Sequence, residues 1–106
     1  MWVLQSVGPE GPLTFRLSPG AVKTVGRAAR ADFVVDAALV SRLHCQITAT
    51  ERALEVVDLS STNGTFVNDT RVDRAGLTHG DRLRIGRIEL KVENQPEQAA
   101  EERSLK

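Results

Sequence analysis

Apolar and polar residues alternate along most of the chain. In Arg82–Ile85 and Glu89–Val92 every second side chain is apolar, which places one face of an extended strand in a core and the other in water. Gly86 lies between these two runs and predicts a final hairpin with a very short turn. Ten short runs rich in strand-forming residues are separated by segments rich in Gly, Pro, Asn and Asp: 2–7, 13–17, 22–25, 33–35, 44–49, 53–59, 65–67, 71–72, 82–85 and 88–93. The pattern therefore predicts an all-β sandwich or barrel.

Residues 1–94 carry no pattern of an amphipathic helix of ordinary length. Ala28–Ala31 and Ala37–Ala38 are rich in alanine, but they are too short to form a stable helix. Residues 95–106 have a different character, because Pro96 is followed by polar helix-forming residues without an apolar stripe. We therefore expect one folded domain over 1–94 and a polar linker or tail over 95–106 that leads out of the domain.

Composition narrows the class of protein. The 106 residues are 41% hydrophobic and 26% charged, and 14 basic residues balance 14 acidic ones, as in a soluble globular domain. No apolar run approaches the ~20 residues that a membrane span needs, and zero net charge argues against a general nucleic-acid or membrane binder. The single Cys45 excludes an internal disulfide and fits a reducing compartment. These features predict a cytoplasmic domain that inserts into no membrane and binds no nucleic acid. We also expect the isolated domain to be a monomer.

Three polar segments are not explained by the strand pattern: Gly26–Arg27, Ser41–His44 and Ser60–Thr65. Together they supply two guanidinium groups, several hydroxyls, a carboxamide and a glycine, and a phosphate monoester is recognised by such donors. Each segment also has a simpler interpretation. An arginine at a strand end is usually solvated, a Ser/Thr cluster is usually a turn, and Asn-Gly is usually a hairpin turn. The residues alone leave both interpretations open.

The order and spacing of these segments resemble the forkhead-associated (FHA) domain. The likeness is carried by Gly26-Arg27, Ser41-Arg42-Leu43-His44, the run Asp58–Asn68 and the closing run His79–Gly86, and it covers about residues 2–93. It implies an FHA-type β-sandwich of about eleven strands without a substantial helix. It also implies a phosphopeptide-recognition module that binds phosphothreonine in a partner protein, as an adaptor or scaffold in Ser/Thr protein kinase signalling. Such a module is not an enzyme and needs no cofactor and no metal.

The resemblance also implies roles for individual residues. Four residues would bind the phosphate: Arg27, Ser41, Arg42 and Thr62. Asn63 would bind the main chain of the ligand beside the phosphothreonine. Four more would shape the loops: Gly26, His44, Gly64 and Asn68.

The sequence departs from the family pattern at a few positions. Asp69 follows Asn68 where a glycine is common, which concerns the shape of the turn. Arg42 stands at a position where Asn or Lys also occurs. Arg30 and Arg87 are candidates for contacts with acidic residues beside the phosphothreonine, although two solvated charges at the rim are the simpler interpretation.

The sequence has two alternative interpretations: a different kind of FHA protein and a small enzyme. An FHA domain that begins with Met-Trp also resembles the N-terminal domain of nuclear DNA-damage-response proteins of the nibrin type, but those often lack the Thr-Asn-Gly sequence found here. The frequent Arg and Ala and the short loops favour a bacterial protein. A small hydrolase using Cys45 or Ser41 with His44 is disfavoured, because neighbours on a strand point to opposite faces and there is no Gly-x-Ser-x-Gly turn.

Overall fold

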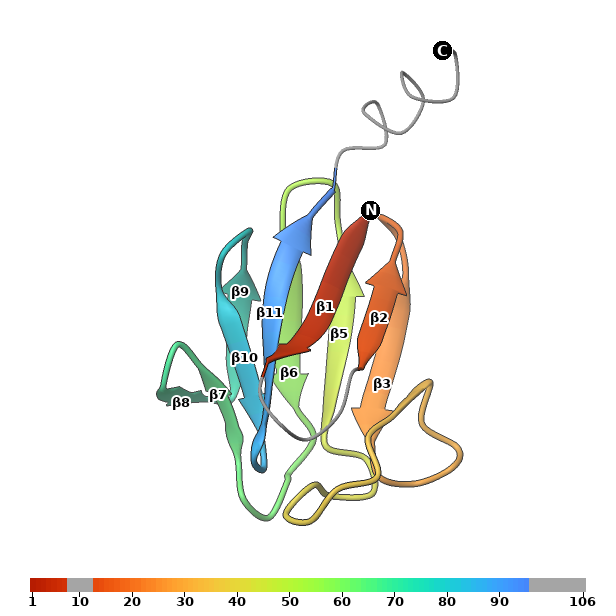
Figure 1. The fold of residues 1–106 in the computed structure, drawn as a ribbon, viewed down its shortest axis with the longest axis vertical. Helices are drawn as coiled ribbons and strands as arrows, with labels where there is room; N and C mark the ends of the chain where they lie inside the picture. The colour runs from red at the N-terminus through yellow and green to blue at the C-terminus, as the bar shows by residue number, and fades with distance from the viewer. Residues whose placement is uncertain (8–12, 96–106) are drawn as a thin grey trace.

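A computed structural model describes residues 1–7 and 13–95, which form two β-sheets that pack face to face (Figure 1). The strands are β1 (Trp2–Val7), β2 (Thr14–Leu17), β3 (Val22–Gly26), β4 (Phe33–Val34), β5 (Cys45–Ala49), β6 (Leu54–Asp58), β7 (Thr65–Val67), β8 (Thr70–Val72), β9 (Arg74–Leu77), β10 (Arg82–Ile85) and β11 (Ile88–Asn94). The first sheet has the order β2-β1-β11-β10-β7-β8, and the second has the order β4-β3-β5-β6-β9. The prediction of an all-β sandwich of about eleven strands is confirmed. The residues that the structure describes form no helix, so none of them belongs to a helix that could cross a membrane.

Ten strands agree with the predicted runs to within one residue at each end, but β9 is absent from the prediction. Its sequence, Arg-Ala-Gly-Leu, has one large apolar side chain and an internal glycine, so it shows no alternation of its own. Its pairing with β6, from Leu54↔Leu77 to Val57↔Arg74, makes it a strand at the edge of the second sheet. β9 is thus defined by its partner and not by a local pattern.

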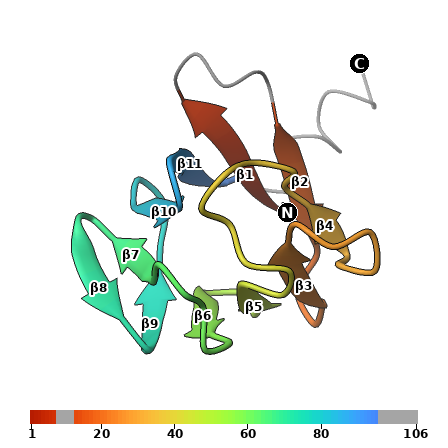
Figure 2. The same cartoon turned by 90° about the horizontal axis from the view of Figure 1, so that it is seen from below.

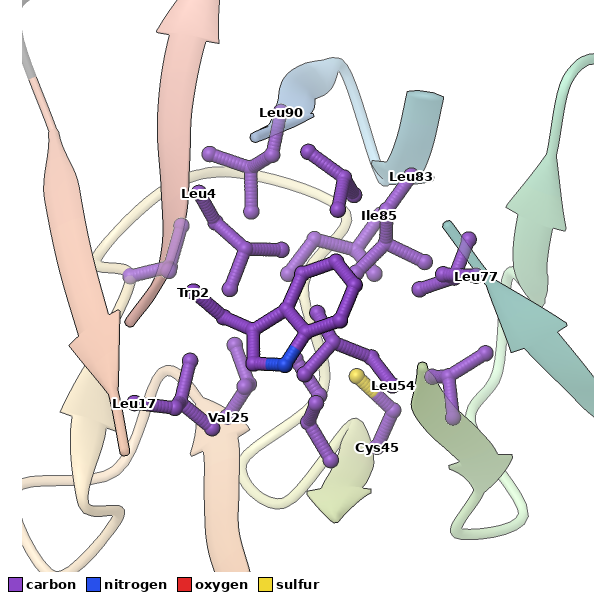
Figure 3. Close-up of a cluster of buried hydrophobic side chains, with 14 of the residues drawn as sticks. Trp2, Leu4, Leu17, Val25, Cys45, Leu54, Leu77, Leu83, Ile85 and Leu90 are labelled. Carbon is purple, nitrogen blue, oxygen red and sulfur yellow. The ribbon is translucent and has the colours of Figure 1, made fainter. Parts of the chain in front are cut away.

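The core between the sheets is built around Trp2, whose side chain is 1% exposed. Figure 3 shows its indole ring amid aliphatic side chains from both sheets, among them Leu4 and Leu54. The indole Nε1 donates a hydrogen bond of 2.7 Å to the carbonyl oxygen of Thr50, so the ring's polar atom is satisfied. Cys45 belongs to the same cluster, as the strand alternation predicts.

Several connections meet at one end of the sandwich, the lower end in Figure 1 and the near side in Figure 2: the β3–β4, β4–β5 and β6–β7 loops and the β10–β11 turn. The β10–β11 turn consists of Gly86 and Arg87, since Ile85 pairs with Ile88, which confirms the predicted tight hairpin. Gly86 has a φ of 58°, and a Cβ there would lie 3.0 Å from the carbonyl oxygen of Ala38. A glycine here lets the β4–β5 loop rest directly on the hairpin.

The chain leaves the sandwich beside its N-terminus. The Gln95 N–H donates to the carbonyl oxygen of Met1 at 2.8 Å, and the N-terminal amine donates to the carbonyl oxygen of Gln95 at 3.0 Å. Sheet-like pairing therefore continues one residue past Asn94. The rest of the predicted tail, from Pro96, lies outside the described residues.

The β7–β8 turn consists of Asn68 and Asp69, with φ angles of 48° and 69°. Positive φ at both central residues of a two-residue hairpin is the type I′ geometry. The Asn68 Oδ1 accepts from the Arg82 N–H at 2.9 Å, and its Nδ2 donates to the Asp81 Oδ1 at 3.1 Å. Within the described residues, the Asp69 side chain makes no hydrogen bond.

Replacing either turn residue by glycine should change the free energy of unfolding, and the two substitutions should change it in opposite directions. We expect Asp69→Gly to raise the free energy of unfolding by about 0.5–1 kcal/mol, because it removes a side chain from a left-handed position without losing a contact. Asn68→Gly should lower it by about 1 kcal/mol or more, since two hydrogen bonds are lost. Urea denaturation of both variants checks this, and destabilisation by Asp69→Gly would contradict it.

Candidate functional site

A cleft of about 520 Å³ lies at the loop end of the sandwich. Four residues singled out from the sequence line it: Arg27, Ser41, Thr62 and Asn63. The segment 36–40 of the β4–β5 loop completes the lining. The fold thus brings together, in one cleft, residues from three loops that are far apart in the sequence.

Arg27 directly follows β3 and is held by the β4–β5 loop. Its backbone N–H donates to the carbonyl oxygen of Ser41 at 2.9 Å, and its Nε donates to the carbonyl oxygen of Val40 at 3.1 Å. A guanidinium has five N–H donors, so the terminal nitrogens remain available to a ligand. Arg27 makes no ion pair with any residue that the structure describes. It is a positioned cation on the wall of the cleft.

The hydroxyls of Ser41 and Thr62 lie on the two loops that face each other across the site. The Ser41 Oγ accepts a hydrogen bond of 3.0 Å from the backbone N–H of Thr62, so its own proton can still be donated to a ligand. The Thr62 hydroxyl has no partner among the described residues. Asn63 donates from its Nδ2 to the carbonyl oxygen of Leu39 at 3.1 Å, which leaves its Oδ1 as an acceptor.

Gly26 allows the end of β3 to approach the β4–β5 loop closely. A Cβ at this position would overlap the carbonyl oxygen of Arg42, which is backbone and cannot move aside as a flexible side chain could. The same oxygen accepts from the Ala28 N–H at 3.1 Å. The Arg42 side chain is exposed and does not line the cleft, although it follows Ser41 directly.

The buried side chain of His44 joins the β4–β5 loop to the β6–β7 loop. Its side chain is 0% exposed; the Ser41 N–H donates to its Nδ1 at 3.0 Å, and its Nε2 lies 2.8 Å from the carbonyl oxygen of Gly64. Because Nδ1 accepts from a backbone N–H, the proton must be on Nε2, which donates to Gly64. The Leu59 N–H also donates to the carbonyl oxygen of His44 at 2.9 Å. One buried imidazole thereby sets the distance between the loops.

Asp58 shapes the β6–β7 loop from within. Its Oδ1 accepts from the hydroxyls of Ser61 at 2.5 Å and Thr65 at 2.7 Å, and its Oδ2 accepts from the Ser61 N–H at 3.1 Å. The Ser61 Oγ in turn accepts from the N–H of Gly64, which has a φ of 89°. Burial acts to raise the pKa of Asp58, but the Ser61 and Thr65 hydrogen bonds outweigh it and hold the pKa below its ordinary value.

Some placements could not be read from the sequence. Asn68 lies outside the cleft and connects the β7–β8 turn to the β9–β10 loop through Asp81. Leu39, which we did not single out, lines the cleft, is 46% exposed and has a φ of 71°. Nothing in the local sequence distinguishes Leu39 from the other aliphatic residues of this loop, Val35, Val40 and Leu43.

The residues of the alternative hydrolase are not arranged for catalysis. Cys45 is fully buried, and burial together with the charge of Asp58 raises the pKa of its thiol to about 12. Both ring nitrogens of His44 are engaged by backbone groups. Across residues 1–7 and 13–95, no group of three or more His, Cys, Asp or Glu side chains could hold a metal ion.

The fold and the cleft agree with a comparison against protein families. The FHA domain model matches residues 23–86, which is more than half of the chain and includes every residue discussed at the cleft. The chain belongs to the FHA domain family. The resemblance inferred from the sequence is thereby confirmed.

Two of the sequence relatives are proteins of Mycobacterium tuberculosis. The chain is 48% identical over 80 residues to the ABC transporter ATP-binding/permease protein Rv1747 of Mycobacterium tuberculosis, covering 76% of this chain and 9% of the transporter. It is 35% identical over 97 residues to the glycogen accumulation regulator GarA of the same species, covering 92% of this chain and 59% of GarA. A structure solved in a study of phosphothreonine-dependent FHA domain interactions superposes with a TM-score of 0.80 at 35% identity, covering 90% of this chain and 97% of that one. The chain therefore spans only part of the full length of these two sequence relatives.

The bridge at His44 predicts a large effect of its removal. His44→Ala should lower the free energy of unfolding by about 2–4 kcal/mol, because a cavity forms and the Ser41 N–H and the Gly64 carbonyl lose their partner. His79→Ala is the matched control. The exposed His79 makes one hydrogen bond, from the Asn94 N–H to its Nδ1 at 3.0 Å, so we expect a loss of about 1 kcal/mol or less. Equal losses in the two variants, measured by urea denaturation, would contradict the bridging role.

The lowered pKa of Asp58 predicts a dependence of stability on pH. The pKa of the Asp58 carboxyl is lower in the folded state than its ordinary value of 3.8, so the ionised carboxylate stabilises the fold at pH values above 3.8. This stabilisation is lost as the pH falls through the pKa of the folded state. We therefore expect the free energy of unfolding to fall less steeply below about pH 4 in Asp58→Asn than in the unmodified chain. Urea denaturation across an acid pH series checks this. Parallel curves for the two proteins would be evidence against it.

Proposed function

We propose that this domain recognises phosphothreonine in a partner protein at the cleft lined by Arg27, Ser41, Thr62 and Asn63. The observation that carries the proposal is the position of the Arg27 guanidinium. It is fixed by two carbonyl contacts of the β4–β5 loop and lines the same cleft as hydroxyls from two loops. A guanidinium group and several hydroxyl donors around an open cleft are suited to bind a dianionic phosphate through its three terminal oxygens.

Each residue has a distinct proposed task. Arg27 pairs with the phosphate charge, and the free protons of the Ser41 and Thr62 hydroxyls are donated to phosphate oxygens. Arg42, exposed beside Ser41, supplies a second cation once a ligand is present. Asn63 binds the main chain next to the phosphothreonine through its Oδ1 and its remaining amide proton.

The site is largely formed before a ligand arrives. In the described part of the chain four hydrogen bonds join the two loops, from Thr62 to Ser41, from His44 to Gly64, from Asn63 to Leu39 and from Leu59 to His44. Donors held in this way lose little conformational entropy on binding. An unphosphorylated threonine offers no anion to Arg27, so the cleft should discriminate strongly between the two forms.

The relatives support a role as an adaptor and not as an enzyme. The domain structure noted above comes from a study of phosphothreonine-dependent interactions, and GarA is a regulator. We propose the corresponding role here: a non-catalytic, cytoplasmic recognition domain in a Ser/Thr protein kinase pathway, followed by a linker. The bacterial sequence relatives do not favour the alternative of a nuclear DNA-damage-response protein.

Peptide binding tests the proposal. We expect a phosphothreonine peptide to bind more tightly than its phosphoserine counterpart and the unphosphorylated peptide not to bind measurably. Arg27→Ala should weaken phosphopeptide binding at least about tenfold, since a charge-assisted hydrogen bond contributes about 1.5–3 kcal/mol. Calorimetry gives these affinities.

Arg52→Ala is the matched control. Arg52 is an exposed arginine in the β5–β6 turn, at the opposite end of the sandwich in Figure 1, and we expect its removal to leave the affinity unchanged. Equal binding of all three peptides, or equal effects of the two variants, would contradict the proposed function.

A further inference from the structure

The outer face of the first sheet collects basic side chains. In its strands, residues such as Leu83, Ile85 and Leu90 point into the core, so the residues between them point outward. By this alternation, the charged residues on the outer face are the basic Arg16, Arg71, Arg82, Arg84 and Lys91 and the acidic Glu89 and Glu93. The outer face of the second sheet carries one of each sign, Arg74 and Glu55. The neutral chain therefore has one distinctly basic face.

Within this face, Arg71, Phe66 and Arg84 form a cross-strand row, which we call the Arg–Phe–Arg ladder. Phe66 on β7 pairs with Arg71 on β8 and with Arg84 on β10. The Arg84 Cζ lies 4.1 Å from the centroid of the half-buried Phe66 ring, a cation–π contact that holds the guanidinium over the sheet. The ladder presents two cations with an aromatic ring between them.

The ladder begins where the cleft ends. The Nε of Arg71 would lie 2.7 Å from a Cβ placed on Gly64, so the guanidinium rests against this glycine. Gly64 directly follows Asn63, which lines the cleft. Arg71 therefore contacts the residue that directly follows one lining the cleft.

Glu89 on β11 is the cross-strand partner of Arg84, but in the described part of the chain its carboxylate forms its ion pair with Arg82. The ion pair on this face joins the Arg82 Nε to the Glu89 Oε1 at 3.6 Å, and neither Arg71 nor Arg84 makes one. Arg71 is exposed. Two unpaired guanidinium groups beside a phosphate-binding cleft are complementary to carboxylates carried by the same ligand.

We propose that the Arg–Phe–Arg ladder binds acidic side chains on one flank of the phosphothreonine, so that Arg71 and Arg84 are specificity-determining residues. This inference rests on the proposed function of the cleft. The sequence suggested Arg30 and Arg87 for the flanking contact; these two, like Arg71 and Arg84, do not line the cleft itself, and the ladder is preferred because its two guanidinium groups are held together on one sheet face by Phe66. Glu89 and Glu93 interrupt the basic face, which favours a short acidic segment over a nucleic acid.

The test uses phosphothreonine peptides with neutral flanks, with an acidic run before the phosphothreonine, and with an acidic run after it. We expect one of the two acidic peptides to bind about two- to fivefold more tightly than the neutral peptide, and we expect high salt to reduce this gain. The double variant Arg71→Gln/Arg84→Gln, which keeps most of the aliphatic stems, should abolish the gain. Arg74→Gln, on the outer face of the second sheet, is the matched control and should retain it.

The outcomes separate this inference from the proposed function. If phosphopeptides bind but acidic flanks give no gain, or a gain that the double variant keeps, the ladder is not a recognition surface while the phosphate site stands. Tighter binding of single-stranded oligonucleotides than of the acidic peptide would overturn the inference in favour of nucleic acid. If no phosphopeptide binds at all, the proposed function fails and the inference fails with it. Thermal denaturation of each variant confirms that it is folded.

Discussion

The site depends on a single buried imidazole. His44 accepts from one recognition loop at Nδ1 and donates to the other at Nε2, and it has no exposed surface. Each contact involves a backbone group, so the bridge fixes the path of the main chain and not only a side chain. Arg27, Ser41 and Thr62 take their places because the two loops are held at this separation.

The rest of the fold makes that bridge possible. The Trp2-centred core holds the two sheets together, and the loops that leave them meet at one end. Gly26 and Gly86 then let the β4–β5 loop approach β3 and the β10–β11 turn without overlap. Of the four described non-glycine residues in left-handed conformations, Leu39 and Ser60 lie in the β4–β5 and β6–β7 loops, and Asn68 and Asp69 form the β7–β8 turn.

Sequence reasoning predicts features that are local. Ten strands follow from alternation and turn residues, and the Gly86 hairpin follows from a glycine between two alternating runs. β9 could not be predicted, because its strand character comes from pairing with β6.

Some features of the cleft could likewise be predicted from the sequence, and others could not. Arg27, Ser41, Thr62 and Asn63 stand out as polar residues that strands do not explain, and the structure brings them together. The contribution of residues 36–40, the position of Asn68 away from the cleft and the contact between Arg71 and Gly64 all depend on cross-strand register or loop packing. Composition alone is misleading here, because a net charge of zero conceals one basic face.

The central claim is that a preformed, His44-bridged cleft recognises a phosphate. NMR titration of the labelled domain with a phosphothreonine peptide tests it most directly. We expect the largest chemical-shift changes on the Arg27 Nε–H and on the backbone amides of Ser41, Thr62 and Asn63, and we expect the unphosphorylated peptide to cause none of them. Large changes elsewhere with these signals unmoved, or the same changes with the unphosphorylated peptide, would contradict it.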